Sequence, residues 1–287
     1  MFETVSSKIQ EDDLQDVRLV ITDMDGTLLT PAGEVTESFR SVHQELLDRG
    51  AHFAVASGRQ YPALSSHFPD DLAKTVFIAE NGAYVVHDGN ELSATPLAAD
   101  DVVEMVTRLR PLAREHNLGL VWSARNAAYL EDDDEYLLRK VRHSYYETRV
   151  IPDLLASPEE ALTLAVIALN EDASKVIEAV REIADTYTVV GSSEMWLDIT
   201  TGGVHKGIGV RALQDQLGLT PSQTMAFGDW LNDMEMLKAV KHSCAMANAH
   251  PDILATARHT TGSNSEDGVA KMLQRVVQAI DAQAHLG

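Results

Sequence analysis

Two aspartates, Asp23 and Asp25, follow an apolar run at residues 19–22 and are themselves followed by Gly26. Residues two apart in an extended chain point the same way, about 7 Å apart along it, so both carboxylates can face one cleft. Clustered carboxylates repel each other and raise one another's pKa, a penalty that a bound cation removes. Oxygen ligands with no His or Cys nearby suit Mg²⁺ better than Zn²⁺. The pair therefore indicates magnesium-dependent chemistry on a carboxylate.

Polar residues also follow three further apolar runs that predict strands. They are Ser57-Gly58-Arg59, Glu80-Asn81-Gly82, and Gly228-Asp229 with Asn232-Asp233. In open parallel α/β sheets, ligands bind outside the carboxyl ends of the strands. Four strands that each bring polar groups to that edge describe a site, with Asp229 joining Asp23 and Asp25. Polar residues at a single strand end can also be an ordinary turn or cap. Taken alone, Asp25-Gly26 could be a plain turn and Asp23 a helix or turn cap.

The elements that must position these residues are short apolar runs alternating with helical patterns. Strands are predicted at residues 19–22, 52–56, 75–79, 224–227 and 243–246, and helices at 36–49 and 233–240. The first helix has apolar positions at helical spacing and a stop at Gly50. Alternation of strands and helices predicts a parallel sheet covered on both faces, which is a doubly wound, Rossmann-like α/β fold.

The middle of the chain has a different pattern. Strands at 84–86 and 91–95 flank Asp88-Gly89, which suits a tight hairpin turn. Helices are predicted at 99–115, 132–146 and 173–187, and strands at 118–123, 163–169, 188–190 and 196–200. Ser157-Pro158-Glu159-Glu160 has the form of a helix start, although a strand pattern follows it. We expect a discontinuous core domain of residues 1–90 and 196–287 and an inserted α+β domain of residues 91–195, with boundaries good to about ten residues.

The composition narrows the class of protein. The chain has 287 residues, 45% of them hydrophobic, which suffices for a large core or two domains. Its net charge of −21 repels nucleic-acid phosphates, and no run of Lys and Arg reverses this locally. The single cysteine, Cys244, excludes an internal disulfide. The longest apolar run, residues 161–169, is too short to span a bilayer. The N-terminus lacks a signal-peptide pattern. We expect a cytoplasmic monomer or weak homodimer with no membrane or nucleic-acid partner.

Four ordered motifs resemble those of the haloacid dehalogenase-like (HAD) superfamily. They are Asp23-Met24-Asp25-Gly26-Thr27, Ser57-Gly58-Arg59, Lys206-Gly207, and Gly228-Asp229-Trp230-Leu231-Asn232-Asp233. Their order, their spacing and the long insert between the second and third are similar to the Cof-type phosphatases with a type IIB cap. Glu80-Asn81-Gly82-Ala83, Met246-Ala247-Asn248-Ala249 and residues 264–270 resemble the same subfamily. The resemblance spans residues 17–273 and implies a HAD core with a cap domain that selects the substrate.

The resemblance implies roles for the acidic residues. Asp23 would be the nucleophile that forms an aspartyl-phosphate. Asp25 would protonate the leaving alcohol and then deprotonate the water that hydrolyses the intermediate. The cofactor Mg²⁺ would be bound by the Asp23 side chain, the Asp25 backbone carbonyl and the Asp229 side chain, with support from Asp233. The metal and the catalytic residues would thus share Asp23 and Asp25.

The resemblance also assigns residues to the phosphoryl group. Ser57 and the backbone of the turn at Gly58 would bind its oxygens, and Lys206 would neutralise both the nucleophile and the transferring group. Arg59, Asn81 and Asn232 are further candidates for substrate contact. For Arg59 the alternative is a salt bridge at a helix start, and Asn232 more often orders such a site than contacts substrate. The acidic run at 131–135 is interpreted as a helix N-terminus, with a second metal site as the alternative.

Together these features predict a hydrolase that acts on a phosphate monoester of a small metabolite, such as a sugar phosphate or a nucleotide-like cofactor. Asp25 favours an oxygen leaving group, because the dehalogenases of this superfamily release a halide that needs no proton and lack an acid there. Two alternatives stay open: a phosphomutase of the same superfamily, and a non-catalytic regulator that binds sugar phosphates. A phosphomutase would hand the phosphoryl group to a second hydroxyl, and a regulator would bind without releasing phosphate.

Overall fold

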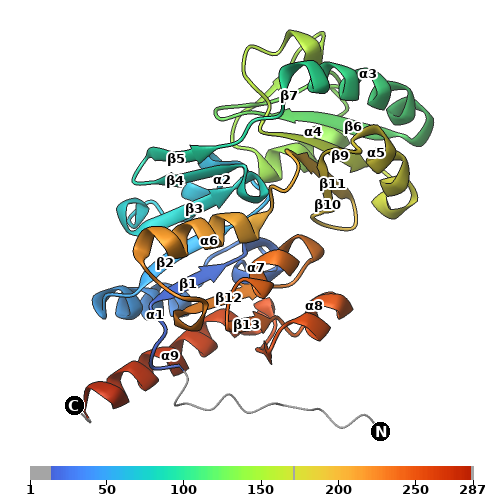
Figure 1. Cartoon of the computed structure of the whole chain (residues 1–287). Helices are drawn as coiled ribbons and strands as arrows, with labels where there is room; N and C mark the ends of the chain where they lie inside the picture. Colours follow the sequence, from blue (N-terminus) through green and yellow to red (C-terminus); the bar gives the residue numbers. More distant parts are fainter. Residues whose placement is uncertain (1–13, 171, 286–287) are drawn as a thin grey trace, which may run out of the picture. The chain divides into compact units, whose positions relative to one another are not determined.

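The structure is a computed structural model that describes residues 14–170 and 172–285. The strands form two sheets, with the orders β14-β13-β12-β1-β2-β3-β4-β5 and β10-β11-β9-β6-β7-β8 (Figure 1). The strands are β1 Leu19–Thr22, β2 His52–Ala56, β3 Thr75–Ala79, β4 Tyr84–His87, β5 Asn90–Ala94, β6 Leu118–Ser123, β7 Ala128–Leu130, β8 Thr148–Val150, β9 Thr163–Ala168, β10 Thr188–Gly191, β11 Trp196–Thr200, β12 Thr224–Gly228, β13 His242–Ala245 and β14 His259–Thr260. The α-helices are α1 Glu37–Asp48, α2 Tyr61–Ser65, α3 Ala99–His116, α4 Glu135–Ser144, α5 Ile177–Ile183, α6 Lys206–Leu217, α7 Met234–Lys238, α8 Pro251–Thr256 and α9 Gly268–Ala284.

The chain divides into two compact units. The first unit is made of Met1–Ala56, Lys74–Val76 and Gly207–Gly287, and the second of Ser57–Ala73 and Phe77–Lys206. These units are defined by contacts within the chain. The core and cap boundaries expected from the sequence stay a prediction.

Parallel strands form the centre of the first unit. Strand β1 pairs in parallel with β12 on one side and β2 on the other, with Thr22 opposite Phe227 and Val55. Every residue of β1 and β12 is buried, as expected for strands covered on both faces. Helix α1 starts after Thr36, whose hydroxyl accepts a hydrogen bond from the Phe39 backbone, and it packs against α9 (Figure 1). The predicted α/β class with a parallel sheet is confirmed.

The six-stranded sheet of the second unit has helices on both faces. Side chains alternate along β6: Leu118 and Trp122 pack with α3 and α5, while Val121 packs with α4. Glycine at position 119 lets α4 approach closely, because a Cβ there would lie 2.5 Å from Cδ1 of Leu137. The hairpin of β4 and β5 turns at Asp88-Gly89, where φ is +50° and +70°, so the predicted tight turn is confirmed.

The helix-start pattern at Ser157-Pro158-Glu159-Glu160 is not used. No helix begins there among the described residues, and the segment leads into β9, as the strand pattern after it indicated. The glutamate at the capping-box position, Glu160, accepts a hydrogen bond of 3.2 Å from Arg125 instead. The helix predicted at 173–187 is shorter, with a single turn at Ala173–Lys175 followed by α5. In the described part of the chain, no helix is long and apolar enough to cross a membrane.

Candidate active site

Three buried carboxylates meet at the carboxyl ends of two neighbouring strands. Asp23 directly follows β1 and Asp229 directly follows β12, and the Asp23 backbone donates a hydrogen bond of 3.0 Å to the Phe227 carbonyl. Asp233 joins them, and one carboxylate oxygen from each residue lies within 4.8 Å of the others. Parallel pairing of β1 with β12 explains this meeting, because both chains leave the sheet at the same edge.

The turn after β1 is built to admit Asp229. Gly26 has φ of +75°, and a Cβ at that position would lie 2.3 Å from Oδ2 of Asp229. The Thr27 hydroxyl donates a hydrogen bond of 2.6 Å to Oδ1 of the same carboxylate. The Asn248 side chain donates to the Gly26 carbonyl at 2.8 Å and so holds the turn from a third segment. Only glycine fits position 26 without displacing a carboxylate of the cluster.

Asp233 orders the second acidic loop. Its Oδ2 accepts hydrogen bonds from the backbone of Asp229 at 2.9 Å and of Trp230 at 3.1 Å. Gly228 allows this packing, since a Cβ there would lie 2.6 Å from the Asp233 side chain. Asp233 thus fixes the loop that presents Asp229. Asn232 lies in the same loop and is half-buried.

Asp25 differs from the three carboxylates of the cluster, Asp23, Asp229 and Asp233. It lies in the turn Met24–Leu28, in an extended rather than helical conformation, and its side chain is exposed. It is not one of the three residues whose carboxylate oxygens cluster. The role expected for Asp25 in metal binding uses its backbone carbonyl, and its exposed carboxyl can exchange protons with water.

The acidic cluster fits a hard divalent cation. Its donor atoms are all carboxylate oxygens, and Asp23, Asp229 and Asp233 are each less than a tenth exposed. Carboxylates at this depth are costly unless a positive charge accompanies them. A buried set of oxygen donors matches the ligand preference of Mg²⁺.

The candidate phosphate-binding residues of the second unit are joined by backbone hydrogen bonds. The Asn81 backbone donates to the Ser57 carbonyl at 2.9 Å, and the Glu80 backbone donates to the Arg59 carbonyl at 3.1 Å. The Ser57 hydroxyl accepts from the Arg59 backbone at 3.2 Å. Ser57, Arg59 and Asn81 are buried, and Lys206, the first residue of α6, is fully buried. Hydrogen bonds therefore join the turn after β2, which contains Gly58, to the turn after β3.

Arg59 also contacts the inserted part of the chain. Its Nη2 lies 2.9 Å from Nε2 of His143 on α4. The neighbouring Gln60 donates from its side chain to the Ala124 carbonyl at 2.6 Å. These contacts connect the turn after β2 with α4 and the loop after β6 inside the second unit.

Two buried acids of the second unit, Glu80 and Asp198, were given no role from the sequence. Burial raises the pKa of Glu80 to about 8, although the Ser123 hydroxyl, which donates to it at 2.6 Å, acts in the opposite direction. Burial also raises the pKa of Asp198, to about 6, while hydrogen bonds and the charge of Lys206 lower it. The only sequence signal for Asp198 was an acid inside the apolar strand pattern at 196–200.

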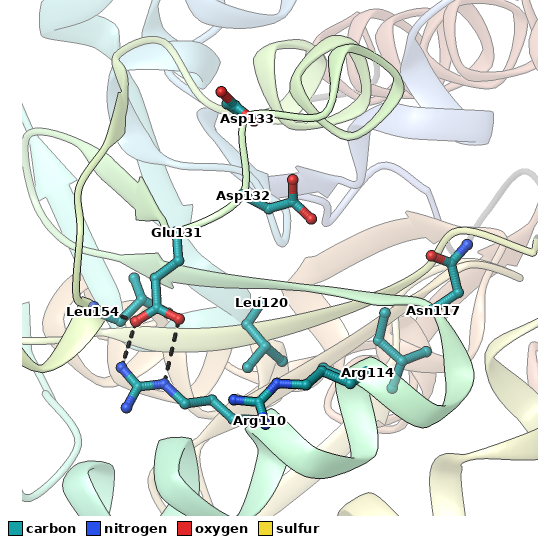
Figure 2. Close-up of a pocket in the computed structure, with 10 residues that line it drawn as sticks. Arg110, Arg114, Asn117, Leu120, Glu131, Asp132, Asp133 and Leu154 are labelled. Carbon is teal, nitrogen blue, oxygen red and sulfur yellow. Dashed lines mark hydrogen bonds and ion pairs between the residues drawn. The ribbon is translucent and has the colours of Figure 1, made fainter.

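The acidic run at 131–135 is used for structure, as interpreted from the sequence. Asp134 caps α4 by accepting a 2.9 Å hydrogen bond from the Leu137 backbone. Glu131 pairs with Arg110 and accepts a hydrogen bond of 2.7 Å from the Leu154 backbone. A hollow of about 390 Å³ is lined by Arg110, Glu131, Asp132 and Asp133, among other residues. Figure 2 shows these residues and the Arg110–Glu131 ion pair.

Comparison with known proteins identifies the family. A model of the haloacid dehalogenase-like hydrolases matches residues 20–273. The Escherichia coli K12 protein 5-amino-6-(5-phospho-D-ribitylamino)uracil phosphatase YbjI is 31% identical over 265 residues, which cover 91% of this chain and 97% of YbjI. YitU of Bacillus subtilis 168, a phosphatase of the same name, is 27% identical and covers 89% of this chain and 96% of its own. The crystal structure of SMU.1108c from Streptococcus mutans UA159 matches with a TM-score of 0.84 and 27% identity, over 91% of this chain and 99% of that one. The chain therefore belongs to the haloacid dehalogenase-like hydrolase family, in which it is a phosphoric monoester hydrolase of the Cof type.

Proposed function

We propose that this enzyme is a Mg²⁺-dependent phosphatase that acts on a small metabolite through an aspartyl-phosphate on Asp23. The observation that carries the proposal is the buried cluster of Asp23, Asp229 and Asp233 at the ends of two paired parallel strands. These residues would hold the metal together with the Asp25 carbonyl. When bound, Mg²⁺ would neutralise the cluster and polarise the phosphoryl oxygens.

The aspartates account for both halves of the reaction. In the first half, the Asp23 carboxylate forms a bond to phosphorus while the ester P–O bond breaks, and the Asp25 carboxyl protonates the departing oxygen. In the second half, water attacks the same phosphorus, Asp25 takes a proton from that water, and the bond to Asp23 breaks. Inorganic phosphate leaves and Asp23 is restored.

Residues of the second unit supply the contacts to the phosphoryl group. We assign the Ser57 hydroxyl and the backbone of the turn at Gly58 to the phosphoryl oxygens, and the Lys206 ammonium to their charge. Arg59 and Asn81 are proposed as substrate contacts, with Asn232 as a further candidate on the acidic loop. The burial of Ser57 and Lys206 supports these assignments, because electrostatic interactions are stronger where water is excluded.

We further propose that the substrate is a phosphorylated sugar alcohol or sugar, alone or attached to a nucleotide-like ring. The support is that YbjI, YitU and YcsE are each named as phosphatases of 5-amino-6-(5-phospho-D-ribitylamino)uracil. That compound carries a terminal phosphate monoester on a ribityl chain. It is therefore the first substrate to test.

The test is phosphate release from this compound and from a panel of sugar phosphates, measured across Mg²⁺ concentrations. We expect turnover that is lost with EDTA and restored with Mg²⁺, and none from an Asp23→Asn variant of unchanged melting temperature. Asp48→Asn, at the end of α1, serves as a matched control that keeps activity.

The products distinguish the alternatives. Free phosphate from a monophosphate supports the phosphatase, whereas isomerisation that requires a bisphosphate activator would identify a phosphomutase. Ligand binding without phosphate release at any Mg²⁺ concentration would contradict the proposal. Full activity of Asp23→Asn would place the nucleophile elsewhere.

A further inference from the structure

Asp198 is a charged residue in the interior of a buried strand. It lies on β11, which is paired with β10 on one side and β9 on the other, and it is 3% exposed. Its neighbours in sequence, Leu197 and Ile199, belong to the hydrophobic core of the sheet. A carboxylate at such a place loses its hydration, so it needs compensating partners.

The partners of Asp198 include two candidate residues of the active site. Nδ2 of Asn81 donates a hydrogen bond of 2.7 Å to Oδ2 of Asp198. Lys206 is close enough for its positive charge to lower the pKa of the Asp198 carboxyl, and the Ser192 hydroxyl acts in the same direction. Asp198 therefore interacts with residues from two other segments of the second unit.

Two glycines show how tightly these segments pack. A Cβ at Gly58 would lie 3.1 Å from Nδ2 of Asn81 and 3.2 Å from Oδ2 of Asp198. A Cβ at Gly82 would lie 2.7 Å from the His205 carbonyl oxygen, next to Lys206. The turn after β2 thus rests directly on the Asn81–Asp198 pair, and the turn after β3 rests on the start of α6.

The backbone around Asn81 is held in an unusual conformation. Glu80, Asn81 and Gly82 have φ of +51°, +53° and +100°. Asn adopts the left-handed region more readily than most residues, whereas for Glu80 this region is sterically unfavourable. A strained segment persists when its surroundings over-determine it, and such segments cluster at functional sites.

The two buried acids of this region differ in charge at neutral pH. Glu80, with a pKa of about 8, is protonated, while Asp198, with a pKa of about 6, is ionised. Of these two acids, Asp198 is therefore the one that carries a negative charge near Lys206. Tyr145, whose pKa burial raises well above its ordinary value, stays neutral beside them.

We infer that Asp198 is a positioning residue of the active site, which holds the Asn81 amide and the Lys206 ammonium in the orientation that meets the phosphoryl group. This role rests on the proposed function. Asp198 acts through these two side chains, and its own carboxylate stays buried on β11. Its effect should appear in the transition state, where charge on the phosphoryl group is stabilised by fixed groups.

Two substitutions separate the two actions of Asp198. Asp198→Asn keeps an oxygen acceptor for Asn81 and removes the charge that faces Lys206, while Asp198→Ala removes both. We expect kcat to fall about tenfold in the first variant and about a hundredfold in the second, with KM changed much less. Inhibition by orthovanadate, which mimics the transferring phosphoryl group, should weaken in parallel.

The matched control is Tyr129→Phe in the same sheet. Tyr129 is as buried as Asp198, and its hydroxyl donates a hydrogen bond of 2.7 Å to Glu159. This variant loses a polar group from the same sheet and should keep kcat and vanadate inhibition. If Asp198→Ala fails to fold, Asp198→Asn still tests the positioning role, because it keeps the shape of the side chain.

A double-mutant cycle with Asn81→Ala tests whether Asp198 acts through Asn81. The loss caused by Asp198→Ala should be smaller in the Asn81→Ala background than in the wild type. If the falls in kcat caused by Asp198→Ala and Asn81→Ala simply multiply in the double variant, the inference is overturned. An unchanged kcat in both Asp198 variants would overturn it as well. The inference would also be overturned if kcat fell only in proportion to the melting temperature, and in the same proportion in Asp198→Asn and Tyr129→Phe. Absence of turnover in the wild type would instead reject the proposed function.

Discussion

At the scale of single residues, Asp25 has the position of a group that exchanges protons. Its carboxyl is exposed while the neighbouring carboxylates are buried, so the two kinds of acid can have different tasks. A buried cluster can hold a cation and present a nucleophile, and an exposed acid can give up its proton in the first half of the reaction and take one from the attacking water in the second.

Asp25→Asn should therefore slow the enzyme in a way that depends on the leaving group. For an alkyl phosphate, we expect kcat/KM to fall by about 10²–10⁴-fold, because the departing alkoxide needs a proton. For p-nitrophenyl phosphate, whose phenolate leaves without one, the first step should lose much less. Steady-state and burst kinetics with both substrates measure this, and equal losses for the two would contradict the assigned role.

Gly26 allows a prediction with an internal control. Gly26→Ala places a Cβ 2.3 Å from Oδ2 of Asp229, whereas Gly33→Ala, at a nearly equal φ of +78°, meets nothing within 4 Å. Both variants should lose about 1 kcal/mol of stability from the left-handed backbone. Only Gly26→Ala should also raise the Mg²⁺ concentration needed for half-maximal activity.

The measurements are melting temperature and Mg²⁺ binding by calorimetry. Equal Mg²⁺ affinity in the two variants would show that Asp229 moves aside without consequence for the metal.

Residue types predicted that Asp23 and Asp229 would meet, because both stand at strand ends in recognisable motifs; the third carboxylate of the observed cluster is that of Asp233 and not that of Asp25. Thr27 and Asn248 orient that cluster from within those motifs, yet nothing in their type indicates a hydrogen bond to Asp229 or Gly26. Asp198 was missed for a different reason. Its hydrogen-bond partner Asn81 is 117 residues away in sequence, and only the pairing of β11 inside its sheet shows that the side chain is buried.

At the scale of elements, the approach of α4 to β6 depends on one missing side chain. Gly119→Ala would place a Cβ 2.5 Å from Cδ1 of the fully buried Leu137. Because the surrounding core is closely packed, we expect a loss of about 1–3 kcal/mol in the free energy of unfolding. Denaturant titration of the variant measures it.

Gly191→Ala is the matched control for this element. Gly191 ends β10 in the same sheet, and a Cβ there would have its nearest neighbour at 3.8 Å, which is ordinary contact. Gly191→Ala should lower the free energy of unfolding much less than Gly119→Ala does. Equal stabilities of the two variants would mean that Leu137 finds another rotamer and that α4 does not depend on the glycine.

Elements defined by their own apolar runs were predicted well. The bounds of β1, β2, β3, β6 and β11 match the sequence patterns, because buried strands need continuous or alternating apolar residues whatever surrounds them. The helix-start pattern at Ser157 is not used, because a cap is only one of the partners that Glu160 can find. Its actual partner, Arg125, lies between β6 and β7, and the local sequence carries no information about that contact.

At the scale of the whole molecule, the buried acid Glu80 should make stability depend on pH. Its pKa is about 8 in the folded chain and about 4.5 when exposed. Between these values the native state keeps a proton that the unfolded state has released, so the free energy of unfolding falls as pH rises. Asp198 contributes in the same direction between about 3.8 and about 6.

Glu80→Gln should remove the larger part of this dependence. It mimics the protonated acid, so the variant should gain up to a few kcal/mol over the wild type at pH 8 and little at pH 4.5. Urea denaturation at both pH values measures the difference. Glu178→Gln, on the exposed side of α5, removes the same formal charge and controls for general repulsion. A wild-type pH slope retained in Glu80→Gln would place the proton uptake elsewhere.

The hydrogen bond from Thr27 to Asp229 joins positions 202 residues apart. A ribosome therefore releases Asp23 long before Asp229 and Asp233, and a nascent chain that ends ahead of β12 holds only one member of the acidic cluster. Parallel pairing over such a separation closes a long loop and is intrinsically slow. The acidic cluster is thus completed only after the whole six-stranded sheet has emerged.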